Sequence, residues 1–288
     1  MRQSNADNVS DATNFRKMSR ISSNLLHARR QVRLMRGDVS LWKAECLVVS
    51  ANPYCEGIAR SSYWRFNGRK NADGAVHREA GASLVAHAHR LMSSHGPLQP
   101  GQAAVTRAVG ALQAKWVIHC VAPEANAQGA QDDLRRTFEA AIAAAVAVDA
   151  RSLALPAIGC GVKGFQPEQA GDVAFSVISK WLNGKSVSDA MHARVVLAQE
   201  ILHAREHSES LLSRLDIVVF SDDVARRWWS RAPAWLGVPA ACAGQRGYFE
   251  AQQHCCRDGV DCQSQSGHGD TSDDLSPGDL VWYQATQH

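Results

Sequence analysis

The chain lacks the long apolar runs that membrane proteins need. No stretch of its 288 residues approaches the roughly 18 consecutive apolar residues of a membrane span. The N-terminus also lacks the apolar segment of a secretory signal, which predicts a cytoplasmic protein with no membrane partner. The chain is nevertheless 45% hydrophobic, enough to build the sizeable core of one large domain or two small ones.

An excess of one charge sign is also missing. The formal net charge is only +3, which disfavours a nucleic-acid binder, whose basic residues would cluster on one face. Residues 60–70 nevertheless interleave aromatic and basic side chains, which can stack on bases and neutralise phosphates. A nucleic-acid-binding module that uses this segment therefore stands as one alternative. We favour a surface excursion whose aromatic side chains pack back on the core. The residues concerned are Arg60, Tyr63, Trp64, Arg65, Phe66, Arg69 and Lys70.

Paired cysteine motifs and the dinucleotide fingerprint are absent. The tail cysteines do not follow a Cys-x-x-Cys spacing, so we predict unpaired thiols and no metal. We expect reduced thiols at the scattered positions as well. No Gly-x-Gly-x-x-Gly follows the first expected strand, which disfavours a Rossmann dehydrogenase, and we predict no cofactor. The tail cysteines are Cys242, Cys255, Cys256 and Cys262; the scattered ones are Cys46, Cys55, Cys120 and Cys160.

Strand-like and helix-like patterns alternate between residues 31 and 236. This alternation predicts a three-layer α/β/α sandwich around a central mixed, largely parallel sheet. A flexible leader is expected over residues 1–30, and a tail of low order over residues 237–288. We expect strands at 33–35, 45–50, 102–108, 115–122, 153–158, 194–198 and 216–220. The expected helices are 73–92, 132–150, 167–182 and 221–229.

Three expected strands end in loops with polar or glycine residues. Gly37-Asp38 follows the first strand, Ala51-Asn52 follows the second, and residues 159–165 follow a later one. Ligands of α/β folds sit beyond the carboxyl ends of the strands. A strand, a glycine loop and a helix in succession collect backbone N–H groups that can hold a phosphate, although such a loop can also be a simple turn.

Five motifs, in this order, resemble those of the macrodomain family and together cover about residues 32–230. Taken singly, each motif is weak, but the shared order makes the resemblance specific. The motifs are Gly37-Asp38-Val39, residues 48–52, residues 71–81, residues 115–119 and residues 156–165.

The resemblance implies a module that binds ADP-ribose, free or attached to a protein or nucleic acid. Nucleic acid is therefore expected only as an ADP-ribosylated substrate. Some family members also hydrolyse ADP-ribosyl links or deacetylate O-acetyl-ADP-ribose. By position, Asp38 would accept a hydrogen bond from the adenine amino group, with the Val39 backbone nearby; otherwise Asp38 is a plain turn residue.

The resemblance also assigns roles to the glycine loop, Asn52 and Asp73. The loop would bind the diphosphate through its backbone amides, Val162 would pack on the ligand, and Phe165 would lie at its adenine or ribose end. Asn52 would bind the distal ribose, and Asp73 would touch that ribose or activate a water, so these two are the predicted catalytic residues. The alternatives are a cap at Asn52 and a helix N-cap at Asp73. The loop residues are Gly159, Cys160, Gly161, Val162, Lys163, Gly164 and Phe165.

The sequence also departs from the family pattern. Residues 68–71 replace a run of glycines with Gly-Arg-Lys-Asn, and the segment between Asn52 and Asp73 is long. Val49 or Ser50 stands where members often have another asparagine. Lys163 stands where many members place an aromatic residue. Binding is therefore the safer inference, and a reader of ADP-ribose without turnover is the alternative. His77 is expected to pack against the sheet rather than to act in catalysis.

Overall fold

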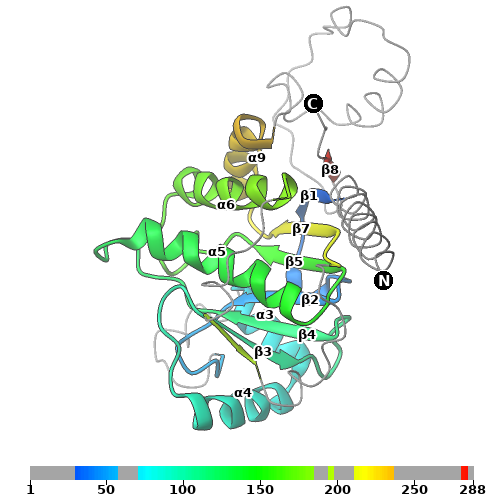
Figure 1. Cartoon of the computed structure of the whole chain (residues 1–288), viewed down its shortest axis with the longest axis vertical. Helices are drawn as coiled ribbons and strands as arrows, with labels where there is room; N and C mark the ends of the chain where they lie inside the picture. The colour runs from blue at the N-terminus through cyan, green and yellow to red at the C-terminus, as the bar shows by residue number, and fades with distance from the viewer. Residues whose placement is uncertain (1–29, 58–70, 185–193, 198–210, 237–279, 285–288) are drawn as a thin grey trace, which may run out of the picture.

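The computed structural model describes residues 30–57, 71–184, 194–197, 211–236 and 280–284 (Figure 1). Within them, eight strands form one sheet in the order β6-β3-β4-β2-β5-β7-β1-β8. Neighbours from β4 to β1 run parallel, whereas β3 is antiparallel to β4 and β8 is antiparallel to β1. The predicted mixed, largely parallel sheet is confirmed. The strands are β1 Gln31–Arg36, β2 Cys46–Ser50, β3 Ala103–Arg107, β4 Trp116–Cys120, β5 Ser152–Pro156, β6 Val195–Leu197, β7 Arg214–Val219 and β8 Leu280–Gln284.

Helices cover both faces of the sheet and complete the three predicted layers (Figure 1). The helices α5, α6 and α9 pack on one face, and α3, α4 and the 3₁₀ helix η1 pack on the other. They span η1 Val39–Leu41, α3 Ala72–Ala80, α4 Ala82–His95, α5 Ala130–Ala147, α6 Pro167–Leu182 and α9 Asp222–Leu236.

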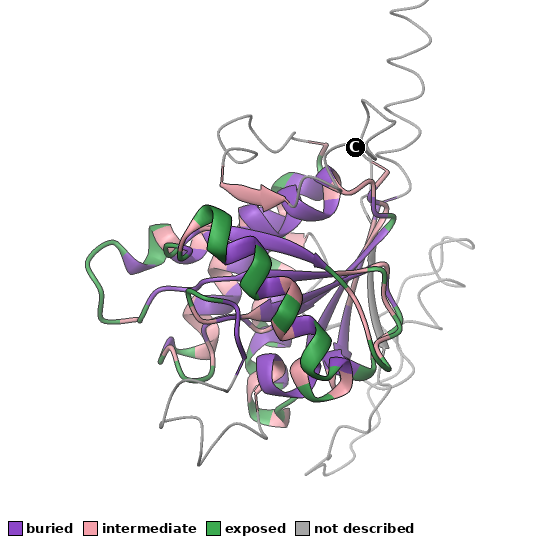
Figure 2. Ribbon diagram, turned by 90° about the horizontal axis from the view of Figure 1, so that it is seen from below, coloured by how far each residue is buried: buried purple, intermediate pink, exposed green. Residues whose placement is uncertain are grey.

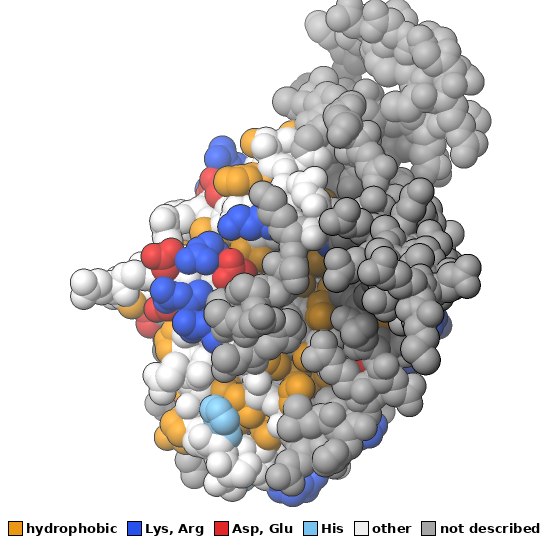
Figure 3. Space-filling view, viewed as in Figure 1, with side chains coloured by type: hydrophobic (Ala, Val, Ile, Leu, Met, Phe, Trp, Pro, Cys, Tyr) orange, Lys and Arg blue, Asp and Glu red, His pale blue; other side chains and the backbone are white. Residues whose placement is uncertain are grey.

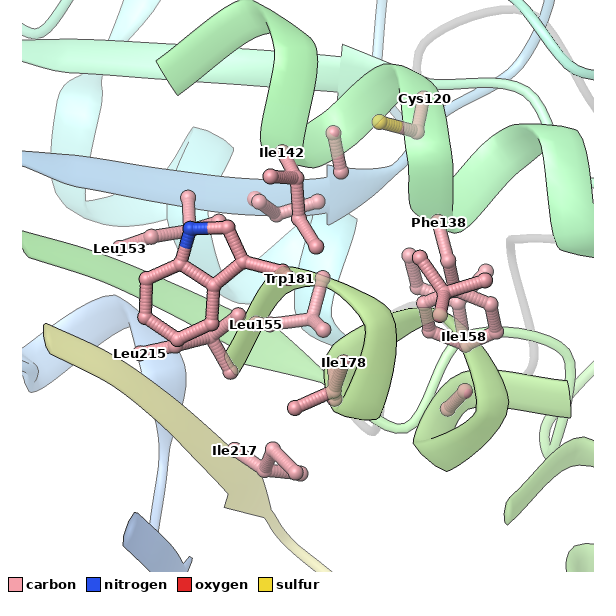
Figure 4. Packing of buried hydrophobic residues seen from close by; sticks show 14 of the residues in the cluster. Cys120, Phe138, Ile142, Leu153, Leu155, Ile158, Ile178, Trp181, Leu215 and Ile217 are labelled. Atoms are coloured by element: carbon pink, nitrogen blue, oxygen red, sulfur yellow. The ribbon is translucent and has the colours of Figure 1, made fainter. Parts of the chain in front are cut away.

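The central strands are buried on both faces (Figure 2). Successive side chains of β2 point to opposite faces, so Cys46 and Val48 join one core while Leu47 and Val49 join the other. This explains why the strand is a continuous apolar run. Figure 4 shows the first core, in which Ile142 of α5 and Trp181 of α6 lie over strand residues such as Leu153 and Leu215.

The predicted single helix over 73–92 is wrong, because the chain breaks at Gly81. Gly81 has a φ of 70°, which favours glycine, and its N–H donates to the His77 carbonyl to end α3. The N-cap alternative for Asp73 is also wrong. The cap of α3 is Asn71, whose side-chain oxygen accepts from the N–H of Gly74 at 2.6 Å.

One further expectation changes near the end of the chain. The last helix was predicted to end at Trp229 but continues to Leu236, with Pro233 inside it. The low order predicted for 237–288 stays a prediction; within that range, residues 280–284 form β8, which pairs with β1. The leader to residue 29, the segment 58–70 and the four tail cysteines lie outside the described residues. The four scattered cysteines are unpaired, as predicted, and none of the described helices is long and apolar enough to cross a membrane.

Candidate functional site

A cavity of about 640 Å³ opens at the carboxyl ends of β1, β2, β5 and β7. The loops after these four parallel strands line it, as the general geometry of α/β folds predicts. The start of α3 and Glu124, which follows β4, complete the wall. The polar and loop residues among its lining are Asp38, Asn52, Asn71, Asp73, Glu124, Gly159, Cys160, Gly161, Lys163 and Ser221.

The strand order arranges these groups in a line. Asp38 follows β1, the glycine loop follows β5, and Asn52 follows β2, which lies on the other side of β5 from β7 and β1. The sheet therefore places Asp38 towards one end of the cavity and Asn52 towards the other, with the glycine loop between them. Asp73 lines the same cavity from α3.

Asp38 shapes its own turn. Its Oδ1 accepts hydrogen bonds from the N–H and hydroxyl of Ser40 at 2.9 and 2.7 Å, which caps η1. A carboxylate has a second oxygen, so the cap leaves acceptor capacity for a ligand. Phe220 also lines the cavity, with 57% of its surface exposed, and the Arg36 guanidinium carbon lies 5.5 Å from its ring centroid. The sequence pattern does not reveal Phe220 as a site residue, because it places this residue at the end of a strand.

The glycine loop presents its backbone to the cavity. Gly159 has a φ of 91° and Gly164 a φ of 76°, conformations that few other residues adopt. Within the described part of the chain, the N–H groups of Gly161, Val162 and Lys163 have no hydrogen-bond partner. All three residues line the cavity, so their amides are available to an anion.

The last two residues of the predicted loop do not line the cavity. Phe165 is 3% exposed and belongs to the core, where its ring packs against Gly159. The ligand contact of Phe165 stays a prediction; in the structure this side chain packs beneath the loop. Gly164 provides the turn that leads to it. Burial raises the pKa of the Cys160 thiol to about 12, which keeps it protonated and unreactive near neutral pH.

Asn52 organises the loop that follows β2. Its side-chain nitrogen donates to the carbonyl of Gly57, and its side-chain oxygen accepts from the N–H of Tyr54, both at 2.9 Å. The alternative role predicted for Asn52, a cap at the end of the strand, therefore describes part of what its side chain does. The side chain also lines the cavity, and its amide nitrogen carries two N–H groups, of which Gly57 takes one.

Asp73 is buried against a histidine on the next turn of α3. His77 Nδ1 lies 3.1 Å from Asp73 Oδ1 and 3.0 Å from the Asp73 carbonyl oxygen. Burial acts to lower the pKa of His77. Hydrogen bonding to Asp73 and the negative charge of the Asp73 carboxylate outweigh burial, so the pKa of His77 is raised. His77 packs beneath the site as predicted, and its ring lies against the buried carboxyl group of Asp73.

A second buried histidine lies behind this pair. His119 on β4 is hydrogen-bonded to Thr106 through Nε2 at 2.9 Å, and its ring centroid lies 6.0 Å from that of His77. Burial, with a smaller effect of His77, lowers the pKa of His119 to about 3, so it is neutral. Ligand atoms of Asp73, His77 and His119 lie within 4.8 Å of one another and could surround a metal ion. The sequence predicted no metal, and that stays a prediction.

Lys163 and Glu124 meet at the cavity rim. Lys163 Nζ lies 2.8 Å from Glu124 Oε1, and the N–H of Ala125 donates to the Lys163 carbonyl at 2.8 Å. In the sequence, Lys163 departs from the family pattern, but nothing near it in the chain indicates its partner. Glu124 lies in a loop with no pattern of its own, so only the folded sheet reveals the pair.

Comparisons with known proteins agree with this geometry. The family model described as Macro domain matches residues 63–174. An O-acetyl-ADP-ribose deacetylase from Cronobacter sakazakii is 31% identical over 156 residues, which cover 53% of this chain and 79% of that protein. A macro domain-containing protein from Vibrio parahaemolyticus is 32% identical over 151 residues, which cover 52% of this chain and 82% of that protein.

Solved structures show the same fold. The Oceanobacillus iheyensis macrodomain with ADP superposes with a TM-score of 0.53 at 17% identity, covering 72% of this chain and 92% of that one. The Trypanosoma brucei macrodomain in complex with ADP gives a TM-score of 0.51 at 22% identity, covering 70% and 69%. With relatives above 30% identity aligned over about four fifths of their length, the chain belongs to the macro domain family.

Proposed function

We propose that the cavity binds ADP-ribose, free or as an ADP-ribosyl modification of a macromolecule, and that Asn52 and Asp73 hydrolyse its ADP-ribosyl or O-acetyl linkage. The order of groups along the cavity carries this proposal. Asp38, the glycine loop and then Asn52 follow one another along the sheet edge. Adenine, diphosphate and distal ribose follow one another in ADP-ribose. The relatives named O-acetyl-ADP-ribose deacetylase support the same class of ligand.

Each part of the ligand has a matching group. The second oxygen of Asp38 accepts from the adenine amino group, beside the backbone of Val39, and the exposed Phe220 ring offers a stacking face. The free N–H groups of Gly161, Val162 and Lys163 receive the diphosphate. The cavity volume of about 640 Å³ lies within the range that is usual for pockets that bind small molecules and cofactors.

Asp73 and Asn52 supply the chemistry at the distal ribose. The bound diphosphate fixes the sugar, and the buried Asp73 carboxylate stabilises positive charge that develops on it. For an ADP-ribosyl linkage, Asp73, or a water that it orients with Asn52, provides the nucleophile at the anomeric carbon. For an O-acetyl linkage, the oriented water attacks the carbonyl carbon of the acetyl group, and acetate leaves. His77 holds Asp73 in place through the 3.1 Å contact with Oδ1.

Two assays test binding and turnover separately. Calorimetry measures ADP-ribose binding, which Asp38→Ala is expected to weaken, and a release assay follows ADP-ribose leaving a modified protein. Asp73→Ala is expected to abolish release and to leave ADP-ribose binding in place. Equal release by the wild type and Asp73→Ala contradicts the catalytic role of Asp73. Failure of the wild type to bind ADP-ribose contradicts the whole proposal.

A non-catalytic reader of ADP-ribose is the second candidate. Lys163 in the glycine loop and Ser50 before Asn52 favour it, because both alter the ribose end of the site. The Arg69 and Lys70 substitutions of the glycine run lie outside the described residues. Tight binding in calorimetry with no released product supports the reader.

The nucleic-acid alternative finds little support on the described surface. Basic side chains lie beside acidic ones on the face seen in Figure 3. On α5, for example, Arg135 contacts Asp132 and Glu139, and Arg136 contacts Asp133. The basic-aromatic residues 60–70 lie outside the described part of the chain. Strong salt dependence of oligonucleotide affinity is the result that favours this alternative. The cytoplasmic location and the domain limits stay predictions from the sequence.

A further inference from the structure

Two histidines and a carboxylate meet at the inner wall of the cavity. Asp73 and His77 lie one turn apart on α3, and His119 comes from β4. One ligand atom from each of the three lies within 4.8 Å of the others. The side chains of His77 and Asp73 are 8% and 3% exposed, and His119 is fully buried. Bulk water therefore does not satisfy these polar groups, and they depend on what lies among them.

One ring atom of this cluster has no partner. His119 Nε2 lies 2.9 Å from Thr106 Oγ1, whereas the buried Nδ1 has no hydrogen-bond partner among the residues that the structure describes. Most buried polar atoms are hydrogen-bonded, so an exception needs an explanation, and a bound ion is one. A histidine that ligates a metal through one ring nitrogen usually donates its other N–H to a nearby oxygen. Thr106 Oγ1 stands in the place of that oxygen.

The spacing of the cluster suits a small ion. Two ligands of a tetrahedral zinc, each at about 2.1 Å from the metal, stand roughly 3.4 Å apart. Asp73 Oδ1 and His77 Nδ1 lie 3.1 Å apart, close to that separation. The ligand atoms within 4.8 Å of one another therefore need side-chain rotations on the order of 1 Å to surround zinc. The ion displaces any proton between Asp73 and His77, because imidazole coordinates in its neutral form.

We propose that Asp73, His77 and His119 bind a divalent transition-metal ion, and that Zn²⁺ matches their donor atoms. Two imidazole nitrogens with one carboxylate oxygen form a ligand set that zinc sites use. Mg²⁺ and Ca²⁺ prefer oxygen ligands alone and are not expected here. Asp73 lines the cavity, so the ion has an entry path, and three protein ligands leave a fourth position for water or a bound molecule.

This inference does not depend on the proposed function, but it bears on it. A carboxylate that ligates an ion is not available as a base. A filled metal site and the metal-free use of Asp73 proposed above therefore exclude each other in the same molecule.

Zinc binding to the full chain tests the proposal. The protein is stripped of metal with a chelator, and its accessible thiols are alkylated, because the cysteines of the tail can also bind zinc. Competition with a chromophoric chelator then measures the number and affinity of the zinc ions that remain. We expect one Zn²⁺ in the wild type, which excess Mg²⁺ does not displace. Asp73→Asn and His119→Gln should each weaken its binding by at least about tenfold.

Two further variants separate coordination from general effects. Thr106→Val keeps the shape of a β-branched side chain but removes the hydroxyl group that contacts His119. The loss of such an outer partner is expected to weaken zinc binding about tenfold. His95→Gln is the matched control, because His95 is an exposed histidine at the end of α4, and zinc binding should not change. Saturating Zn²⁺ should raise the unfolding midpoint of the wild type and of His95→Gln, but not that of Asp73→Asn.

Several outcomes overturn the proposal. They are an alkylated wild type that takes up no Zn²⁺, an affinity that Asp73→Asn leaves unchanged, and an equal fall of affinity in His95→Gln. Unfolding without metal shows whether each variant is folded, and Thr106→Val keeps the test valid if His119→Gln does not fold. Calorimetry with ADP-ribose on the same metal-free wild type reports on the proposed function, so failure of that function and failure of the metal site are distinct results.

Discussion

The two sides of the cavity are built from different chemical groups. The side after β5 offers backbone N–H groups of Gly161, Val162 and Lys163, held by a loop of glycines. The side made by the β2 loop and α3 offers buried side chains, above all Asp73 and His77. Backbone amides do not titrate and bind an anion at any ordinary pH, whereas the charge of His77, whose pKa is raised, changes with pH. Under the proposed function, the first side serves recognition of the ligand and the second side serves the chemistry.

This division makes the α3 side the more sensitive to a small change in packing. Gly57 has a φ of 65°, and a Cβ there would stand 2.6 Å from the ring of His77. We expect Gly57→Ala to lower the free energy of unfolding by about 3 kcal/mol, from the strained backbone and the collision together. Denaturant unfolding measures this loss.

Gly129→Ala is the matched control for that collision. Gly129 also has a positive φ, 73°, but a Cβ there meets nothing within 4 Å. It should therefore show only the backbone cost, of about 1 kcal/mol. If both variants lose the same free energy of unfolding, the His77 ring does not lie against Gly57 as it does in the structure.

Gly57→Ala should also slow the proposed hydrolysis. It should leave the affinity for ADP nearly unchanged, because ADP lacks the distal ribose.

The glycine loop gives the next largest effect. A Cβ on Gly159 would stand 3.1 Å from the Phe165 ring, at a φ of 91°. We expect Gly159→Ala to cost about 2 kcal/mol of stability and to weaken ADP-ribose binding, because the whole loop shifts. Calorimetry and unfolding on the same samples measure both.

Gly161→Ala separates binding from folding on this side. Its Cβ has nothing within 4 Å, so the unfolding free energy should change by less than about 0.5 kcal/mol. Affinity should still fall, since the new methyl group stands where the backbone approaches the diphosphate. Unchanged affinity for ADP-ribose in Gly161→Ala contradicts the phosphate role of the loop.

Much of the recognition side could be predicted from the sequence, because its information is local. A strand, glycines and a helix in succession specify a loop such as 159–165 without reference to the rest of the chain. The order of the strands in the sheet is harder to predict from the sequence. Only the assembled sheet places Asp38, the loop and Asn52 in a line, since β2 pairs with β4 and β5 and not with β1.

The chemistry side depended on contacts between distant segments. His119 reads as one residue of a buried strand, and nothing local indicates that it lies against Thr106 and His77. Phe165 is the opposite case, because its place in a motif predicts a ligand contact while its ring packs under Gly159 in the structure. Lys163 is an unusual residue for its motif, but its partner Glu124 lies 39 positions away and in an irregular loop.

A smaller effect is expected at the adenine end. Asp38→Ala removes the two hydrogen bonds to Ser40 and should cost about 1 kcal/mol of stability, the usual value of a helix cap. Asp38→Asn keeps an oxygen for the cap but loses the charge, so it should retain most of that stability. Both variants should weaken ADP-ribose binding if the carboxylate accepts from the adenine amino group. An unchanged ADP-ribose affinity in Asp38→Asn shows that Asp38 acts only as the cap of η1 and not as an acceptor for the adenine amino group.

The smallest expected effect is that of a change at Asp172, which tests whether contacts between α6 and α9 help to position the glycine loop. Asp172 on α6, the helix that follows the loop, accepts from Arg231 at 2.9 and 2.7 Å and from Trp235 of α9 at 2.8 Å. Burial acts to raise the pKa of Asp172, but these hydrogen bonds and the Arg231 charge hold it below its usual value. A carboxyl group whose pKa is lower in the folded state stabilises the fold above its unfolded pKa, about 3.9, and this contribution is lost as the pH falls through the folded value.

Asp172→Asn should therefore reduce the free energy of unfolding at neutral pH, by less than about 1 kcal/mol because the pair is partly exposed. The difference from the wild type should shrink steadily below about pH 4, where the wild-type carboxyl group also becomes protonated. Unfolding curves of both proteins at several pH values measure it. ADP-ribose affinity should not change, because α6 is also anchored through Phe175 and Trp181 in the core. A loss of affinity in Asp172→Asn shows that the α6–α9 contact positions the loop, and that the recognition side is less self-contained than its local sequence indicates.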